Sequence, residues 1–460
     1  MRVLLWHGYL MTGSGSNLYT ANLARVWRKA GHDILLLCQE TKAGSLSFVD
    51  EEGDFSSDNA SFKTSLTGIL TATGRCRLVR PFIDQLLPVY VYDDYEGFVV
   101  KRFVDLTDDE LARYTEMNVE ALVTAIEEHR PDAIITGHEV MGPYIALQAT
   151  RRTGHEYLAK LHGSALEYAV KEQRERYLPY AIEGLSGARV VTGGSNYMIK
   201  EAASVVSGWE QSAAVVNPGC DVEIFTPPQA PRSPPPLVGY VGKFIVSKGV
   251  HNFLAALGCV SEEMHAVVVG YGGYEAELRK LGEALGAGDA SAVRALAQRG
   301  DGTKPLTGVL EWLDSDGMDA GYRARAKRIE VEWSGRLDHG PLSQVLPSFE
   351  LLIVPSVVPE AFGMVAAEAA ACAVLPIVPA HSGIGEVGAT LESELGRHDL
   401  LTFDPNDPVR GIATAIDRLL ALDPSDRHAL GMEAARVARE LWSWEHVADK
   451  LLKLAAEGKP

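Results

Sequence analysis

Short apolar segments alternate with longer amphipathic segments along most of the chain. Brief runs of Val, Leu and Ile are typical of strands buried in a parallel sheet, whereas apolar residues three and four positions apart are typical of helices. The expected strands occupy residues 2–6, 33–38, 133–136, 156–161, 189–192, 213–216, 237–241, 265–269, 329–333 and 351–356. This alternation predicts an α/β protein with doubly wound parallel sheets.

Helical periodicity follows most of these strands. The expected helices occupy residues 17–30, 108–129, 274–285, 364–373, 426–441 and 444–456, with a further helix that ends at residue 257. Two stretches break the alternation. Residues 41–100 are less regular, with one expected strand at 88–92, and residues 287–327 form an insertion of unknown role.

A proline-rich segment at residues 227–236 separates two series of β-α-β units. Such a segment is stiff and does not enter a helix or a central strand. We expect an N-terminal Rossmann-like domain at 1–226, a C-terminal Rossmann-like domain at 237–425 and terminal helices at 426–460. A chain of 460 residues is too long for a single core, which also suggests two domains. Two successive β-α-β series joined by a linker are expected to face each other across a cleft.

The charge of the chain limits its partners. The formal net charge is −18 without a long run of Lys or Arg, which argues against nucleic acid and against a strong hold on anionic membranes. Five scattered cysteines without C-x-x-C spacing are typical of reduced thiols in a cytoplasm. The N-terminus shows neither a signal peptide nor a membrane span, so we expect a cytoplasmic protein without membrane association. The oligomeric state is open.

Two carboxylates eight residues apart, Glu360 and Glu368, flank the point where an apolar strand turns into an alanine-rich helix. At about 1.5 Å rise per residue they lie on the order of 12 Å apart, too far to cleave one bond between them, which needs roughly 5–9.5 Å. The spacing suits two hydroxyl-bearing parts of one long ligand. Between them the amides of Phe362, Gly363 and Met364 begin the helix and favour an anionic group such as a diphosphate. Alone, the pattern is equally typical of two solvated glutamates.

One glycine-containing loop follows the first strand of each domain. In the first, Gly13 and Gly15 resemble a dinucleotide fingerprint, but Leu18 replaces its third glycine, so only a flexible, amide-rich loop is indicated. In the second, which begins at Gly242, the side chains of Lys243 and Lys248 can neutralise a diphosphate leaving group. A lysine pair in a loop is by itself more typical of a solvated surface.

Three histidines, His7, His138 and His162, follow the carboxyl ends of expected strands, and Glu139 adjoins the second. Open α/β sheets bind ligands at this edge. Each histidine alone is as consistent with a structural role, but their common position favours function. Their spacing is not that of zinc ligands.

These landmarks together resemble the retaining, nucleotide-sugar-dependent glycosyltransferases of the GT-B architecture, family 4, the glycosyltransferase group 1 type. The resemblance covers nearly the full chain. Its landmarks are residues 13–15, His162-Gly163, residues 217–227, residues 242–249, Gly335-Arg336 and residues 355–368 with Cys372.

The resemblance implies roles for the donor site. Lys243 and Lys248 would hold the donor diphosphate, with Gly15 approaching it from the facing domain, and Glu368 would bind the ribose hydroxyls. Glu360, with the amides of residues 362–364, would bind the transferred sugar. Gly13 and Gly242 would complete the donor loops.

The remaining roles follow from the same resemblance. His162 would touch the sugar near the reacting carbon, Arg336 would border the base, and His7, His138 and Glu139 would lie on the acceptor side. The final helix would cross back and pack on the N-terminal domain. Two positions depart from the family pattern: Lys243 stands where arginine is usual, and Ala373 replaces a glycine. Lys243 keeps the charge but lacks the bidentate geometry of arginine.

The expected activity is transfer of a hexose-type sugar, with retention, from a nucleotide diphosphate sugar to a hydroxyl of an acceptor. The acidic charge favours a soluble small molecule or glycan over a lipid. We expect no cofactor and no metal, and we interpret Asp314 and Asp316 as a solvated acid pair in a loop. The alternatives are a sugar-nucleotide epimerase or a glycan phosphorylase on the same scaffold, or a sugar-binding protein without catalysis.

Overall fold

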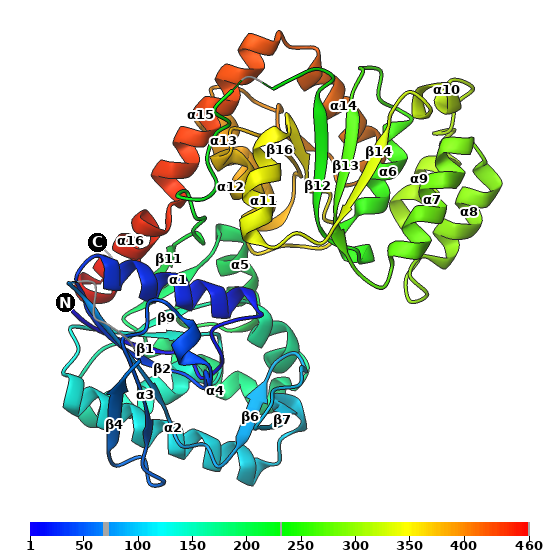
Figure 1. Cartoon of the computed structure of the whole chain (residues 1–460). Coiled ribbons are helices and arrows are strands. Elements are labelled where there is room, and N and C mark those ends of the chain that lie inside the picture. The colour runs from blue at the N-terminus through cyan, green and yellow to red at the C-terminus, as the bar shows by residue number, and fades with distance from the viewer. Residues whose placement is uncertain (68–72, 231, 459–460) are drawn as a thin grey trace. The chain divides into compact units, whose positions relative to one another are not determined.

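The structure is a computed structural model that describes residues 1–67, 73–230 and 232–458. The chain divides by its contacts into unit 1, which comprises Met1–Gly219 with Trp444–Pro460, and unit 2, which comprises Cys220–Ser443 (Figure 1). The boundary therefore lies before the proline-rich segment, not at residue 226, and residues 220–236 group with unit 2. Proline content marks a stiff stretch of chain, whereas tertiary contacts decide to which unit it attaches.

Unit 1 is built on a nine-stranded sheet in the order β11-β10-β9-β8-β1-β2-β5-β3-β4. Its strands are β1 (Arg2–Trp6), β2 (Asp33–Leu37), β3 (Glu51–Phe55), β4 (Phe62–Leu66), β5 (Arg75–Arg80), β8 (Ala133–Gly137), β9 (Leu158–Lys160), β10 (Val190–Gly193) and β11 (Ala213–Val215). Only β3 and β4 pair antiparallel among these described strands. Since β1 lies between β2 and β8, the strand order reverses at β1 and β8, and their carboxyl ends border a switch point.

Residues 41–100 are more regular than the sequence pattern predicted. They contribute β3, β4 and β5 to the sheet, and β6 (Leu86–Val89) pairs in parallel with β7 (Val99–Arg102). The hydrophobic pattern of the sequence does not reveal these strands, because several of their side chains are charged. These charges are paired between neighbouring strands. Arg75 of β5 pairs with Glu51 of β3, and Arg80 Nε lies 2.7 Å from an oxygen of Asp54.

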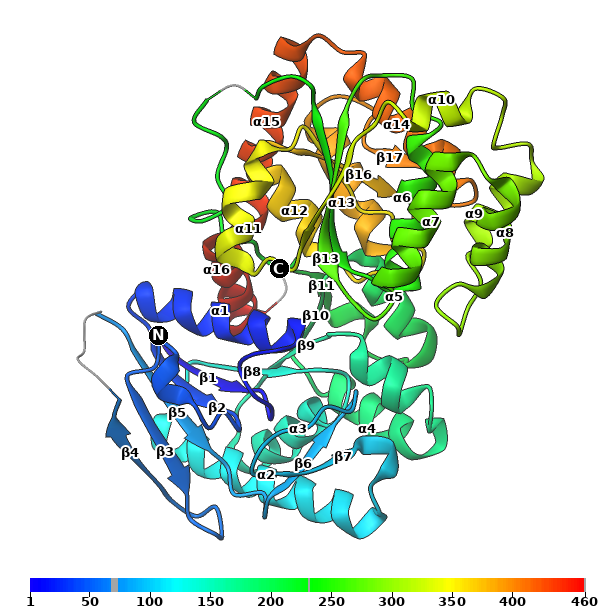
Figure 2. The same ribbon diagram turned by 45° about the vertical axis from the view of Figure 1, so that its right-hand side comes forward.

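Helices cover both faces of the unit 1 sheet (Figures 1 and 2). They are α1 (Gly15–Lys29), α2 (Asp108–His129), α3 (Gly142–Thr153), α4 (Arg174–Ser186), α5 (Asn196–Val205) and α16 (Trp444–Glu457). α1 and α16 lie side by side on one face, and α2, α3 and α4 pack together on the other. The Trp27 indole donates a hydrogen bond of 3.1 Å to the Ala448 carbonyl, and the Trp444 ring meets Tyr19 edge-on. The apolar stripe of the last helix is thus buried within unit 1.

Unit 2 has an all-parallel six-stranded sheet in the order β14-β13-β12-β15-β16-β17. Its strands are β12 (Leu237–Lys243), β13 (His265–Tyr271), β14 (Val331–Gly335), β15 (Leu351–Ile353), β16 (Leu375–Pro379) and β17 (Thr402–Phe403). In chain order within the unit this arrangement is 3-2-1-4-5-6, the order of a Rossmann fold. The strand order reverses between β12 and β15, so the unit's switch point lies at their carboxyl ends.

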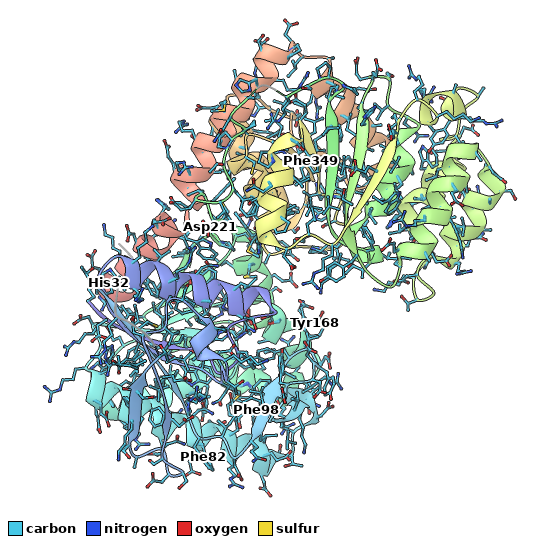
Figure 3. All side chains as sticks on the ribbon, viewed as in Figure 1. His32, Phe82, Phe98, Tyr168, Asp221 and Phe349 are labelled. Atoms are coloured by element: carbon cyan, nitrogen blue, oxygen red, sulfur yellow. The ribbon has the colours of Figure 1, made fainter. Side chains whose placement is uncertain are left out.

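The unit 2 sheet is also covered on both faces. Its helices are α6 (Val250–Leu257), α7 (Glu275–Ala287), α8 (Ala290–Arg299), α9 (Thr307–Asp314), α10 (Tyr322–Ala326), α11 (His339–Val345), α12 (Met364–Ala371), α13 (Ser382–Glu394), α14 (Pro408–Leu420) and α15 (Pro424–Trp442). α6 packs with α14 on one face and α12 with α15 on the other. Packing against β12 is close, because a Cβ on Gly239 would lie 2.2 Å from the buried Phe349 ring (Figure 3).

The insertion at 287–327 is largely helical, so the interpretation as a loop acid pair is wrong for Asp314, whereas Asp316 lies exposed in the turn after α9. Asp314 ends α9 and lies 2.7 Å from Arg294 of α8 in an ion pair. The insertion packs on α6 through Trp312 and Tyr322, whose rings are 5.3 Å apart, and the Tyr322 hydroxyl donates to a carbonyl of α6. Its amphipathic helices had no identifiable partner in the sequence.

Three general findings concern the described parts of both units. The five cysteines are free, and all but Cys259 are buried. None of the described helices combines the length and apolar character of a membrane span. Residues 1–67, 73–230 and 232–458 contain no group of three or more His, Cys, Asp or Glu side chains placed to hold a metal ion.

Candidate functional site

A cavity of about 430 Å³ lies at the switch point of unit 2. It is bordered by the loops that follow β12, β13 and β15 and by the first residues of α11 and α12. The residues that line it are Tyr240, Val241, Gly242, Lys243, Lys248, Val269, Gly270, Tyr271, Leu337, His339, Leu342, Val354, Ser356, Glu360, Met364, Val365 and Glu368. Both predicted lysines and both predicted glutamates therefore line one cavity.

The loops after β12 and β15 contact each other through backbone at Gly249. This residue has φ +68°, and a Cβ there would lie 1.8 Å from the Pro355 carbonyl oxygen. The amide of Val357 also donates a 3.0 Å hydrogen bond to the Ser247 carbonyl. Glycine at 249 is thus required by both conformation and space, and this contact places Lys248 beside Glu360.

Lys248 and Glu360 form an ion pair inside the cavity, with Nζ 2.8 Å from Oε1. The Ser356 hydroxyl donates to the same carboxylate oxygen. The backbone at Glu360 is fixed as well, because its amide donates to Ser382 Oγ at 3.0 Å and its carbonyl accepts from the Gly383 amide at 2.8 Å. The carboxylate is held in one place while its charge is balanced by the lysine.

Lys243, the other predicted cation, is the last residue of β12 and its side chain is exposed. The expected loop begins within the strand, since β12 extends to this residue. No carboxylate in the described part of the chain forms an ion pair with Lys243 at 4.0 Å or less, in contrast to Lys248.

The N-terminus of α12 borders the cavity through Met364 and Val365. Its first amides lack intrahelical acceptors and favour an anion. Gly363 has φ +94°, and a Cβ there would lie 2.8 Å from the Ile384 side chain. The Phe362 side chain is buried and meets the Trp442 ring edge-on at 5.6 Å. The side chain of Phe362 is therefore not available to a ligand in this conformation.

Glu368 lies about one turn into α12 and is buried. His339, at the start of α11, has Nε2 3.4 Å from Glu368 Oε1. The hydrogen bond with Glu368 raises the pKa of His339 above its ordinary value, and burial opposes the shift. His339 was missed in the sequence. Its signal was the one used for the other histidines, a position just after the carboxyl end of a strand.

Arg336 does not line the cavity. Its guanidinium lies 4.8 Å from the centre of the Tyr271 ring and donates to Asp338 at 2.9 Å. Tyr271 and Leu337 do line the cavity. Arg336 is therefore adjacent to the cavity wall and touches it through Tyr271.

In unit 1 the three predicted histidines come together at the ends of β1, β8 and β9. The ring centres of His138 and His162 are 4.8 Å apart, and those of His7 and His138 are 6.1 Å apart. Burial lowers the pKa of His7 to about 4 and holds the pKa values of the other two well below the ordinary value. At neutral pH the cluster is uncharged.

Glu139 holds the backbone next to the histidine cluster. Its side chain is fully buried, and Oε1 accepts a 2.8 Å hydrogen bond from the Gly163 amide. Burial raises the pKa of Glu139 to about 7. Beside it, buried Lys160 has a pKa lowered by burial to about 7, and its Nζ donates to the Val216 carbonyl at 2.7 Å. In this geometry Glu139 fixes the His162-Gly163 turn.

Gly13 and Gly15 flank Ser14 at the start of α1. Gly13 has φ +92°, and a Cβ on either glycine would meet no atom within 4 Å. The Ser14 hydroxyl caps the helix by accepting from the Asn17 amide. Ser14 and Asn17 also line a second cavity, of about 110 Å³, in unit 1. The glycine loop thus borders open space at the unit 1 switch point.

Known proteins resemble this chain in sequence over part of its length. Residues 320–437 match the family model described as "Glycosyl transferases group 1". A D-inositol 3-phosphate glycosyltransferase of Rhodococcus opacus (strain B4) is 32% identical over 179 residues, which cover 38% of this chain. The chain spans only 36% of the length of that relative in this match.

Solved structures resemble nearly the whole chain. Sucrose-phosphate synthase from Thermosynechococcus elongatus is 20% identical, with 98% of each chain covered and a TM-score of 0.55. The Anabaena protein HepE in complex with UDP is 14% identical, with 98% of this chain and 99% of that chain covered and a TM-score of 0.61. The chain therefore has the GT-B fold with two Rossmann-like domains. The sequence match to the family described as "Glycosyl transferases group 1" covers residues 320–437, which lie in unit 2.

Proposed function

We propose that this protein is a retaining glycosyltransferase of family 4, which moves a hexose-type sugar from a nucleotide diphosphate sugar to a hydroxyl of an acceptor. One observation carries the proposal: two lysines, the N-terminus of α12 and two glutamates line a single cavity at the Rossmann switch point of unit 2. Cations and free amides suit a diphosphate, and the separated carboxylates suit two sets of sugar hydroxyls.

In this proposal Lys243 and Lys248 neutralise the departing diphosphate. Glu368 accepts hydrogen bonds from the ribose hydroxyls, and His339 orients its carboxylate. Glu360, together with the amides of residues 362–364, binds the transferred sugar, and these amides also favour the adjacent diphosphate. UDP is the first nucleotide to test, because HepE was solved with UDP.

The roles of unit 1 are proposed from the resemblance and from the geometry within that unit. His7 and His138 belong to the acceptor side, and Glu139 acts by holding the turn that carries His162. We keep the assignment of His162 to the reacting end of the sugar and of Gly15 to the diphosphate. Lys160, which is buried beneath this cluster, is not expected to contact a substrate.

The proposed chemistry is front-side displacement without an enzyme nucleophile. The bond between the anomeric carbon and the phosphate oxygen breaks, the acceptor oxygen bonds to that carbon on the same face, and the acceptor proton passes to the departing phosphate oxygen. The configuration is retained. The protein contributes positioning and stabilises the negative charge on the diphosphate through Lys243 and Lys248, so we propose that no metal is required.

Three other functions remain as alternatives: a sugar-nucleotide epimerase, a glycan phosphorylase and a sugar-binding protein without catalysis. Net transfer of sugar to a separate acceptor would exclude the epimerase, and activity without inorganic phosphate would exclude the phosphorylase. Release of nucleotide would exclude the binding protein. We also propose the cytoplasm as the compartment, supported by the free cysteines.

A screen of nucleotide sugars by thermal shift tests the donor part of the proposal. A ligand at 100 times its dissociation constant stabilises a protein by about 2.7 kcal/mol, which is readily measured. Product analysis by NMR, with and without excess EDTA, tests the chemistry. We expect the donor's anomeric configuration in the product and unchanged activity in EDTA. An inverted product, or loss of activity that added metal restores, would contradict the mechanism.

A further inference from the structure

The cavity in unit 1 has a mixed aromatic and polar lining. Its volume of about 110 Å³ is below the roughly 300 Å³ or more of a drug-sized pocket, so it suits a single ring. The residues that line it are Tyr9, Leu10, Ser14, Ser16, Asn17, Val89, Tyr90, Val91, Tyr95, His138 and Ser164. They come from the carboxyl ends of β1, β6, β8 and β9 and from the start of α1.

One buried polar atom of this cavity lacks a partner. His138 is 2% exposed, and its Nε2 has no hydrogen-bond partner among the described residues, while Nδ1 lies 3.4 Å from Ser164 Oγ. An unpaired buried nitrogen is costly unless a ligand or water satisfies it. Nε2 itself has almost no accessible surface in this conformation, so a ligand reaches it only after a small rearrangement of the lining. Burial lowers the pKa of His138 well below its ordinary value, so an uncharged hydroxyl suits it as a partner.

The cavity offers no cation to an anionic ligand. Neither Lys nor Arg occurs among its described lining residues. The basic residues of the strands nearest in sequence already pair with carboxylates: Arg80 with Asp54, Lys101 with Glu110 and Arg102 with Asp105. A phosphate in the cavity would therefore lose hydration without gaining a cation.

The loop beside the cavity is acidic. Asp93, Asp94 and Glu96 flank Tyr95, and all three carboxylates are exposed. Burial, and after it the charge of Asp93, raise the pKa of Tyr95, a residue that lines the cavity. No basic side chain in the described part of the chain forms an ion pair with any of the three. The loop therefore repels an approaching phosphate.

We propose that this cavity is the acceptor subsite and that it takes an uncharged, hydroxyl-bearing ring and discriminates against phosphorylated sugars and polyols. The inference rests on the proposed glycosyltransferase function and names its acceptor class. Tyr9, Tyr90 and Tyr95 supply aromatic surface, and His138 Nε2 accepts a hydrogen bond from one hydroxyl of the ring once the lining adjusts to expose it. Two similar proteins, a sucrose-phosphate synthase and a D-inositol 3-phosphate glycosyltransferase, have names that include a phosphorylated compound. The acceptor proposed here differs because it carries no phosphate.

The test compares matched probes on the full chain in saturating UDP. The pairs are glucose with glucose 6-phosphate and myo-inositol with myo-inositol 1-phosphate, and 4-nitrophenyl β-glucoside is an aromatic probe. Titrations followed by ligand-observed NMR give the dissociation constants. We expect at least one neutral probe to bind in the millimolar range and its phosphorylated partner, where it has one, to bind at least tenfold more weakly.

Two variants and a control make the test specific. Tyr95→Ala should weaken the neutral probe at least fivefold, whereas Tyr92→Ala, in the same loop but outside the cavity lining, should leave it unchanged. The combined variant Asp93→Asn, Asp94→Asn and Glu96→Gln should reduce the discrimination against phosphate. It should leave the affinity for the neutral probe unchanged.

Two results would overturn the acceptor inference. One is a phosphorylated probe that binds as tightly as its neutral partner or more tightly. The other is no neutral binding up to 100 mM in a protein that still binds UDP. Failure to bind any nucleotide would instead count against the proposed donor function, and the probe comparison can then still be read without UDP.

Discussion

The ion pair between Lys248 and Glu360 leads to an unusual prediction for the variant Glu360→Gln. A diphosphate can use the Lys248 cation only after the lysine leaves the carboxylate, which is 2.8 Å away. The amide of glutamine keeps an oxygen that can accept from Ser356, but it carries no charge. We therefore expect this variant to bind free UDP more tightly than the natural protein while it transfers sugar more slowly.

The size of the effect follows from the exposure of the pair. Two unit charges about 4 Å apart interact by about 4 kcal/mol at an effective dielectric constant of 20. The Lys248 side chain is 37% exposed and that of Glu360 is 16% exposed, so screening reduces the net value to about 1 kcal/mol. That energy corresponds to about a fivefold change in dissociation constant.

Isothermal titration calorimetry with UDP measures this change directly. Measurements at about 0.05 M and 0.5 M salt should show the gain shrinking as salt screens the lysine. Glu368→Gln is the matched control because it removes a carboxylate from the same cavity, and we expect it to weaken UDP binding through the ribose. Initial rates of transfer for both variants complete the comparison.

The reasoning would be refuted if Glu360→Gln weakened UDP binding as severely as Glu368→Gln. That result would mean that Glu360 contacts the nucleotide and does not restrain Lys248. Equal transfer rates in the natural protein and Glu360→Gln would separately refute the role of this carboxylate toward the sugar.

Three further predictions concern stability. Gly249→Ala should destabilise unit 2 by at least about 2 kcal/mol in urea unfolding, because the left-handed conformation and the contact with the Pro355 carbonyl both oppose a side chain; an unchanged midpoint would contradict the contact. The pKa of His7 is lowered to about 4 in the fold. His7 therefore does not reduce the free energy of unfolding above about pH 6.5, but it reduces that free energy as the pH falls toward 4. It should cost about 2 kcal/mol between pH 7.5 and 5, and in His7→Gln the drop in the urea-derived free energy should be smaller by that amount. Deleting residues 444–460 removes the acceptor of the Trp27 indole and should increase hydrogen exchange in α1, and unchanged exchange there would show that α16 does not stabilise it.

The sequence by itself determined the two α/β halves and the loops that carry the donor chemistry. Buried parallel strands need continuous apolar runs, and helices need three- and four-residue spacing, so both are written locally in the chain. The turn into α12 was predictable for the same reason, since a glycine after an apolar strand and an alanine-rich run mark it. Glu360 was thereby placed in the loop before this helix, and Glu368 was placed on the helix itself.

Charged strands and the helices of the insertion could be recognised only from the tertiary structure. β5 contains Arg75 and Arg80, and its place in the sheet depends on carboxylates of β3 more than twenty residues away in the chain. The insertion could be recognised as helical only once α6 provided a surface for Trp312 and Tyr322. Local patterns cannot show which distant partner neutralises a charge or covers an apolar stripe.

The chemical state of the candidate site residues was likewise decided by the tertiary structure. The sequence placed Glu139 and His138 together at a strand end, but burial makes the first a support for the His162 turn and leaves a buried nitrogen of the second without a hydrogen-bond partner. It indicated two lysines, and only the fold pairs Lys248 with Glu360 and adds His339 to Glu368. The physical reason is that residue identity follows from the chain, whereas pKa, charge balance and free hydrogen-bonding atoms depend on neighbours that folding brings from elsewhere.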